Sequence, residues 1–206
     1  MNLDRSLTEE SFKLGLKELA TKDEDFAEIL EKWGNPPRWE EDAGFSGLVR
    51  TILGQQVSVG SANATMKRLC DLGPLTPENL LELDDTQLKA CGISRQKIVY
   101  VKELATAITK QELDLQQLAI ADDTTIRNQL KRIKGIGDWT VDIYLLMSLQ
   151  RPDAFPKGDL GVIAAYQKLK NLSTRPTPDE LEIIAEKWRP WRAIAARILW
   201  HYYLNR

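Results

Sequence analysis

Apolar residues recur along this chain at the three- and four-residue spacing of a single helix face, as at Leu16 and Leu19 and at Leu104 and Ile108. Nowhere do Val, Ile, Tyr and Thr alternate with polar residues over the length of a strand. The pattern therefore predicts an all-α fold of about ten to twelve short helices.

Helix ends are marked by cap residues. Two segments match the capping box, Ser6–Glu9 and Thr177–Glu180, the second with proline at its first helical position. Further expected N-caps are Asp23, Ser58, Thr76, Asp84 and Ser94, and the expected C-terminal glycines are Gly34, Gly73 and Gly92. These signals predict where the helices begin and end.

The composition is that of a packed soluble protein, with 206 residues of which 43% are hydrophobic and 28% charged. No apolar run approaches the length of a membrane span, and the first residues lack a signal-peptide pattern. Two cysteines and one histidine are too few for a disulfide framework, a cysteine-ligated iron–sulfur cluster or a histidine-rich metal site. We expect an intracellular protein with reduced thiols.

The net charge of −2 is unevenly distributed. Residues 1–42 hold twelve acidic and six basic residues, whereas 187–206 and 127–134 hold basic residues and no acid. A molecule with one basic face can bind phosphates while its acidic side stays in solvent. The alternative is that these segments are ordinary solvated helix faces.

The segment Leu130–Thr140 is typical of two helices joined by a tight Gly-Ile-Gly turn. The N–H groups around Gly135 and Gly137 could approach a phosphate closely. The same pattern also fits a simple turn between two helices. Basic residues crowd this turn and Trp139 follows it, which favours DNA as the ligand.

Asp159 ends a Pro/Gly-containing loop twenty residues after Trp139. A carboxylate at a fixed distance from a phosphate clamp could be held against the neighbouring sugar, which suggests chemistry at one nucleotide of DNA. Asp138, Asp142 and Asp153 are competing candidates, and Asp159 could also serve as the N-cap of the next helix.

Two adjacent glutamines, Gln55 and Gln56, lie at a helix junction. Such side chains could fill the gap left by an extruded base, or they could be exposed polar residues before a Ser58 cap. Trp191 and Trp200 are nine positions apart and face opposite sides of one helix. At most one of them can share a pocket with Trp139, and the other belongs to the core.

Four ordered motifs, at Ile52–Ser58, Ile133–Thr140, Phe155–Asp159 and Trp188–Arg192, give the chain a family resemblance over residues 40–206. It resembles the helix-hairpin-helix superfamily of DNA base-excision glycosylases, especially the 3-methyladenine DNA glycosylase II type. The resemblance implies a single domain of two helical lobes with a substrate cleft between them. The terminal lobe would comprise residues 1–42 and 151–206, and the central lobe residues 43–150, which carry the hairpin.

The resemblance also assigns roles to residues. Asp159 falls on the catalytic aspartate, and Gly135 and Gly137 on the glycines whose N–H groups hold a phosphate. A monovalent cation could bind the hairpin backbone at Ile133 and Ile136, and no catalytic metal is expected. Further expected DNA contacts are Lys134, Thr140, Gln56, Ser58 and Arg192, with Gln56 wedged into the duplex.

Trp139 stands where bifunctional relatives carry a lysine that attacks C1′, so the resemblance implies a monofunctional enzyme without lyase activity. The expected base pocket comprises Trp139, Trp200, Tyr144 and Gln55. Ile143 and Leu160 stand where some relatives carry further aromatic residues, so the resemblance implies a pocket with fewer aromatic side chains.

The resulting expectation is a DNA repair glycosylase. It would flip alkylated purines such as 3-methyladenine and 7-methylguanine out of double-stranded DNA and hydrolyse their N-glycosidic bond, without a cofactor. We expect a monomer with no membrane partner, located in the cytoplasm on the nucleoid, or in the nucleus of a eukaryote. The alternatives are a glycosylase for deaminated or mismatched bases and a non-catalytic DNA-binding module.

Overall fold

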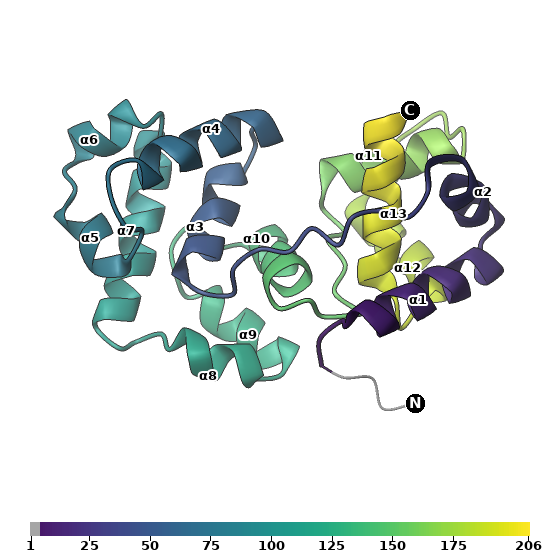
Figure 1. The fold of residues 1–206 in the computed structure, drawn as a ribbon, viewed down its shortest axis with the longest axis horizontal. Helices are drawn as coiled ribbons and strands as arrows, with labels where there is room; N and C mark the ends of the chain where they lie inside the picture. The colour runs from purple at the N-terminus through teal and green to yellow at the C-terminus, as the bar shows by residue number, and fades with distance from the viewer. Residues whose placement is uncertain (1–4) are drawn as a thin grey trace. The chain divides into compact units, whose positions relative to one another are not determined.

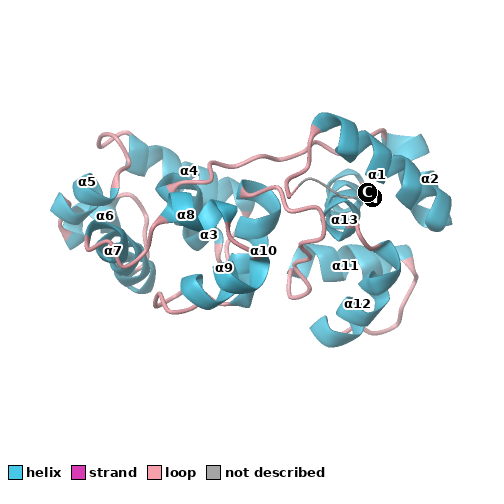
Figure 2. Ribbon diagram, turned by 90° about the horizontal axis from the view of Figure 1, so that it is seen from below, coloured by secondary structure: helices cyan, strands magenta, loops and turns pink. Residues whose placement is uncertain are grey.

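The computed structural model describes residues 5–206, and all regular structure in this part of the chain is helical (Figure 2). The all-α prediction is confirmed. The chain divides into two compact units, a terminal unit formed by the chain up to Glu40 together with Leu145–Arg206, and a central unit, Glu41–Tyr144. None of the helices in the described residues has the length and apolar character needed to span a bilayer.

The units change over at residues 40 and 144, whereas the predicted lobes changed over at residues 42 and 150. Residues 145–150 belong to the terminal unit because their polar groups bind it. The Leu7 N–H donates to the Gln150 carbonyl at 2.7 Å. The Arg197 guanidinium donates to the Leu146 carbonyl and to the Gln150 side chain, both at 2.9 Å. These contacts span the chain, so no local pattern could place the boundary.

The terminal unit is assembled from both ends of the described chain (Figure 1, purple helices against green and yellow ones). Its helices are α1 (Glu9–Lys22), α2 (Glu24–Trp33), α11 (Leu160–Leu169), α12 (Pro178–Ala185), a 3-10 turn (Glu186–Trp188) and α13 (Arg192–Asn205). The last helix, α13, packs against α11, α2 and α1 and so forms the centre of this unit.

Two tryptophans of the Trp188–Arg192 motif lie in the core of the terminal unit. Trp188 is fully buried, packs on Phe26 with ring centroids 5.0 Å apart, and donates its indole N–H to Asp23 at 3.0 Å. Trp191 is equally buried and donates to Glu18 at 2.7 Å. The prediction that one of the last two tryptophans belongs to the core is confirmed for Trp191.

The central unit carries the hairpin. Its helices are α3 (Phe45–Gly54), α4 (Val59–Cys70), α5 (Pro77–Glu82), α6 (Asp85–Ala90), α7 (Arg95–Thr109), α8 (Leu115–Ile120), α9 (Asp123–Leu130) and α10 (Asp138–Ile143), and a π-helical turn (Tyr144–Ser148) follows. The longest of them, α7, packs against α3, α5 and α6, while α9 packs against α10. This packing places α7 behind the turn that joins α9 to α10.

Most of the predicted caps are confirmed. Side-chain caps form at Ser58, Thr76, Asp84, Ser94 and Thr177. The first capping box is wrong by two residues, because Thr8 and Ser11 form it. Ser6 lies too far before the helix to reach its N–H groups and instead donates to the Leu149 carbonyl at 2.9 Å. Asp23 precedes α2, but its carboxylate makes no cap bond.

Candidate functional site

The turn between α9 and α10 has a backbone that only glycine adopts easily. Gly135 has a φ of +91°, and a Cβ built there would lie 2.0 Å from Cγ of Tyr100 on α7. The turn therefore rests directly on an aromatic ring. Glycine at residue 135 is required both for the left-handed conformation and for this close approach.

The turn leaves backbone donors unpaired. Among the described residues, the N–H groups of Gly135 and Gly137 donate to no acceptor, and Gly137 is the N-cap of α10. The Ile136 side chain is buried, and its N–H donates to the Ile133 carbonyl at 3.1 Å, which holds the turn in shape. Free N–H groups at such a turn suit an anion. A cation on the Ile133 and Ile136 backbone stays a prediction.

Gln55 braces the turn from the end of α3. Its amide donates to the Gly135 carbonyl and to the Thr140 hydroxyl, both at 2.9 Å. Thr140 is only 2% exposed, and its expected DNA contact stays a prediction. The Gln55 amide has both of these partners inside the central unit, which gives it a structural role. Its place in a base pocket stays a prediction.

Lys97 binds the same junction, a role that no sequence motif indicates. Its ammonium donates to the Leu53 and Gln55 carbonyls at 2.6 and 2.7 Å, and burial lowers the pKa of Lys97. The two carbonyls are left over at the end of α3, where a cation is favoured. The residue lies on an ordinary helix pattern, so only the fold reveals this contact.

Gln56, the predicted wedge, follows the braced residue. It is exposed and has a φ of +55°, an uncommon conformation for a residue with a side chain. The neighbouring Val57 and Val59 are 45% and 70% exposed. Ser58 is also exposed, and its hydroxyl caps α4. Gln56 is thus presented to solvent on a firmly held junction.

The charged residues of the hairpin are largely paired with one another. Asp138 accepts hydrogen bonds from Lys131 at 2.8 Å and from Arg127 at 2.9 Å. These bonds lower the pKa of Asp138, and the one from Lys131 has the larger effect. Asp142 is buried and pairs with Arg127. Both acids therefore stabilise α10 against α9, while Lys134 is exposed beside the free N–H groups.

In the terminal unit, Asp159 is the N-cap of α11. Its Oδ1 accepts from the Val162 N–H and from the Trp200 indole N–H, both at 2.9 Å. The side chain is partly exposed, so these donors fix a carboxylate that solvent can still reach. Gly161 approaches closely, since a Cβ there would lie 3.1 Å from the same oxygen. The expected cap role is confirmed.

The loop before Asp159 is anchored on both sides. Lys157 donates to Glu182 at 2.7 Å and to Asp179 at 3.0 Å on α12, and these hydrogen bonds raise the pKa of Lys157. Phe155 packs against Trp188 with ring centroids 6.0 Å apart. The loop that ends at the Asp159 carboxylate is therefore held by a core contact at Phe155 and by ion pairs at Lys157.

Two other predicted site residues have structural contacts. Tyr144 is fully buried, and its hydroxyl donates to the Ala43 carbonyl at 2.6 Å. Its place in a base pocket stays a prediction. Arg192 binds both oxygens of Asp153 at 2.9 Å, also contacts Glu186, and is 12% exposed. Because this guanidinium already binds two carboxylates, few of its N–H groups remain for a phosphate. Its expected DNA contact stays a prediction.

Several basic side chains of residues 187–206, where a basic face was expected, are paired with acids or buried. Lys187 pairs with Asp23, Arg189 pairs with Glu186, and Arg197 is fully buried. Trp39, for which no sequence motif indicates a role, packs edge-on against Trp200, with ring centroids 6.2 Å apart and planes at 80°. Trp139, in the first turn of α10, is partly buried.

A family model described as HhH-GPD superfamily base excision DNA repair protein matches residues 49–190. The chain belongs to the HhH-GPD superfamily. The match contains the Gln55–Gln56 junction, the glycine hairpin and the Asp159 loop in full, and the Trp188–Arg192 motif as far as Pro190. The resemblance inferred from the sequence is confirmed.

Two relatives and one solved structure match this HhH-GPD chain over most of their own length. DNA-3-methyladenine glycosylase 1 of Schizosaccharomyces pombe is 31% identical, over 88% of this chain and 83% of the relative. An alkylbase DNA glycosidase-like protein of the same organism is 27% identical, over 92% of each. A solved structure of a Schizosaccharomyces pombe 3-methyladenine DNA glycosylase in complex with abasic DNA superposes with a TM-score of 0.84 at 30% identity, covering 90% of this chain and 94% of that one.

Proposed function

We propose that this chain is a monofunctional DNA glycosylase that hydrolyses the N-glycosidic bond of alkylated purines, such as 3-methyladenine and 7-methylguanine, in duplex DNA. The observation that carries the proposal is the Asp159 carboxylate, fixed by two N–H donors and partly exposed. The names of the relatives support the substrate class.

The central unit would bind the DNA. The unpaired N–H groups of Gly135 and Gly137 would donate to one phosphate of the damaged strand, with Lys134 adding positive charge. Taking a base out of the stack costs a few kcal/mol. Gln56, exposed on its braced junction, would offset that cost by occupying the vacated space.

Asp159 would act on the sugar. As the C1′–N bond breaks, its electron pair leaves with the base and positive charge develops on the deoxyribose. A carboxylate held beside that charge stabilises the transition state. Water then adds to C1′ and gives up a proton. The hydrogen bonds to Val162 and Trp200 keep the carboxylate aligned without reorganisation during the reaction.

The identity of Trp139 supports the monofunctional assignment. An indole has no amine to attack C1′, so no covalent intermediate and no strand cleavage are expected. An alkylated purine is cationic, and stacking on a tryptophan face adds about 0.5–2 kcal/mol of cation–π attraction. Trp139 and Trp200 are the proposed stacking partners. An attraction of this size favours electron-poor bases without discriminating finely among them.

The test is free-base release from methylated duplex DNA in the presence of a chelator, comparing the intact protein with Asp159→Asn. Asparagine is also a good N-cap, so the variant keeps the start of α11. We expect Asp159→Asn to lose about 10³-fold in release rate at nearly unchanged DNA affinity. Asp153→Asn, which breaks an ion pair in the same unit, is the control and should keep its release rate.

Release of 3-methyladenine with strands that stay intact until alkali is added would establish a monofunctional enzyme. Strand cleavage without alkali would overturn that part of the proposal. If the intact protein releases no methylated base, duplexes containing hypoxanthine or uracil test the alternative lesions. Salt-dependent binding with no release from any of these substrates would identify a non-catalytic DNA-binding module.

A further inference from the structure

Trp39 has an unusual backbone conformation. Its φ is +43°, and it is the one aromatic residue among residues 5–206 with a positive φ. A bulky side chain in this region is a genuine outlier, and such conformations persist only where the surroundings impose them. They also concentrate at functional sites.

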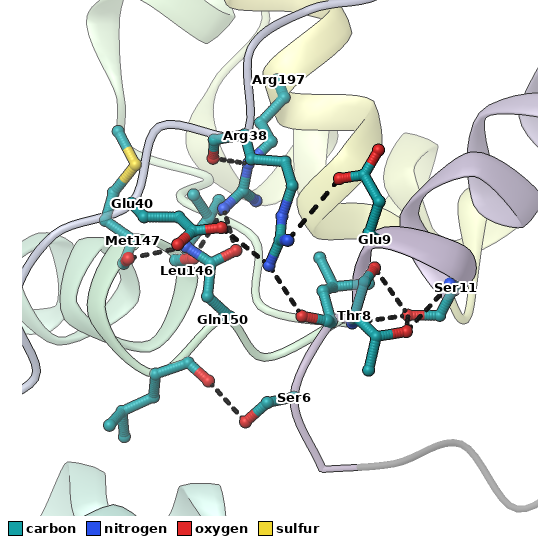
Figure 3. Close-up of polar contacts among 12 residues, drawn as sticks. Ser6, Thr8, Glu9, Ser11, Arg38, Glu40, Leu146, Met147, Gln150 and Arg197 are labelled. Carbon is teal, nitrogen blue, oxygen red and sulfur yellow. Dashed lines mark hydrogen bonds and ion pairs between the residues drawn. The ribbon is translucent and has the colours of Figure 1, made fainter.

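The contacts of its chain neighbours impose this conformation on Trp39, and Figure 3 shows those of Arg38, Glu40 and Arg197. The fully buried Arg197 donates to the Arg38 carbonyl, directly before Trp39, at 2.6 Å. The Arg38 guanidinium donates to the Leu7 carbonyl at 2.9 Å and pairs with Glu40 at 2.8 Å, so this ion pair spans Trp39. The backbone on both sides of Trp39 is thereby fixed.

Arg197 is a firm anchor because it sits at the centre of the terminal unit. It donates to the Ala193 and Leu146 carbonyls and to the Gln150 side chain as well as to Arg38. Burial lowers the pKa of Arg197 to about 9, so the guanidinium is still cationic at neutral pH. A buried cation needs all of its acceptors, which disfavours any movement of the segment that ends at Trp39.

The fixed ring of Trp39 meets Trp200 edge-on, and the Trp200 indole N–H donates to Asp159. We propose that Trp39 is a positioning residue, which sets the Trp200 ring so that its N–H reaches the carboxylate of Asp159. The role in catalysis rests on the proposed glycosylase function. The role in positioning Trp200 does not, and the two are tested separately.

The first experiment measures single-turnover release of 3-methyladenine by Trp39→Leu and Trp39→Phe. We expect Trp39→Leu to slow release about tenfold, or ~1.4 kcal/mol, with DNA affinity unchanged. Trp39→Phe keeps an aromatic edge and should recover most of the rate. Trp33→Leu is the matched control, because it removes a similar edge-on pair, Trp33 with Tyr202, in the same unit.

The second experiment introduces Trp39→Leu into the Trp200→Phe variant and measures the same release rate. If Trp39 acts through Trp200, Trp39→Leu causes no further loss of rate in that background. An additional tenfold loss, or equal slowing by Trp33→Leu, would overturn the proposal.

The third experiment follows the indole N–H resonances of ¹⁵N-labelled protein without DNA, each assigned by a Trp→Phe variant. In Trp39→Leu we expect the Trp200 resonance to move, while those of Trp188 and Trp191, which donate to Asp23 and Glu18, stay in place. An unmoved Trp200 resonance would refute the positioning role. This result holds even if the protein releases no base, so failure of the proposed function and failure of the inference are distinguishable.

Discussion

The hairpin of the central unit and the Asp159 site of the terminal unit, which comprises Asp159, Trp200 and Trp39, present different parts of the chain to a ligand. The hairpin offers main-chain N–H groups, and the side chains that shape it, Gln55 and Tyr100, stand behind them. The Asp159 site offers one carboxylate held partly by another side chain.

This difference fits two different tasks. Main-chain donors suit a group that every nucleotide carries, the phosphate, and they contain no information about the base. A single oriented acid suits one reacting atom. Changes in the hairpin should therefore alter affinity for any DNA, whereas changes at the Asp159 site should alter the rate of the bound complex.

Gly135→Ala should have the largest effect on DNA affinity. The new methyl group would overlap the Tyr100 ring in a backbone conformation that alanine disfavours, so the turn must shift. Losing one charge-assisted hydrogen bond of ~2–3 kcal/mol weakens DNA binding about 30- to 150-fold. The measurement is the Kd for undamaged duplex. Gly137→Ala is the control for folding, since nothing lies within 4 Å of its Cβ and its thermal stability should be unchanged.

Trp200→Phe should come next, and it should affect rate. Removing the indole N–H takes one donor from the carboxylate, and a hydrogen bond to a charged group contributes ~1.5–2 kcal/mol, so single-turnover release falls about ten- to thirtyfold. Kd for the same duplex should stay within about twofold, well under a 1.4 kcal/mol change. A matching loss of affinity would show that the proposed separation of tasks is false.

Gln55→Ala removes the brace behind the hairpin. Two neutral hydrogen bonds are lost, and the Gly135 carbonyl is less firmly held. A net cost of ~1 kcal/mol corresponds to about fivefold weaker DNA binding. Titration of undamaged duplex gives the Kd, and release at saturating protein should keep its rate. A slower reaction at saturation would instead place Gln55 beside the base, as the sequence suggested.

Lys134→Met should have the smallest effect. The side chain is exposed, so its removal should weaken binding about threefold at moderate salt and reduce the slope of log K against log salt by about one. Lys13→Met on α1, also exposed, serves as the control. An unchanged slope would mean that Lys134 contacts no phosphate.

Local features of the fold could be predicted from the sequence. Helix periodicity and caps such as Ser58, Ser94 and Thr177 depend on neighbours three or four residues away, and the structure has them as expected. The hairpin glycines could be recognised because a tight turn restricts the residue types it accepts. The cap role of Asp159 followed from the same local argument.

Contacts distant in sequence could not be predicted. Tyr144 and Thr140 were expected near the base and the DNA, and only the fold shows that their side chains contact Ala43 and Gln55. Trp39 follows a proline-rich break and looks like an ordinary loop residue, because its conformation is imposed by Arg197, far along the chain. Such residues become visible only when the chain is folded.

The discontinuous terminal unit has a consequence for synthesis on the ribosome. The central unit has all its helices once residue 144 has emerged, whereas α1 and α2 must wait for α13, with apolar residues such as Phe12 and Phe26 uncovered. Asp159 gains its Trp200 partner only when the last helix is made. A nascent chain would thus have its proposed DNA-binding hairpin before its proposed catalytic site is complete. Synthesis of α13 is the step that completes that site.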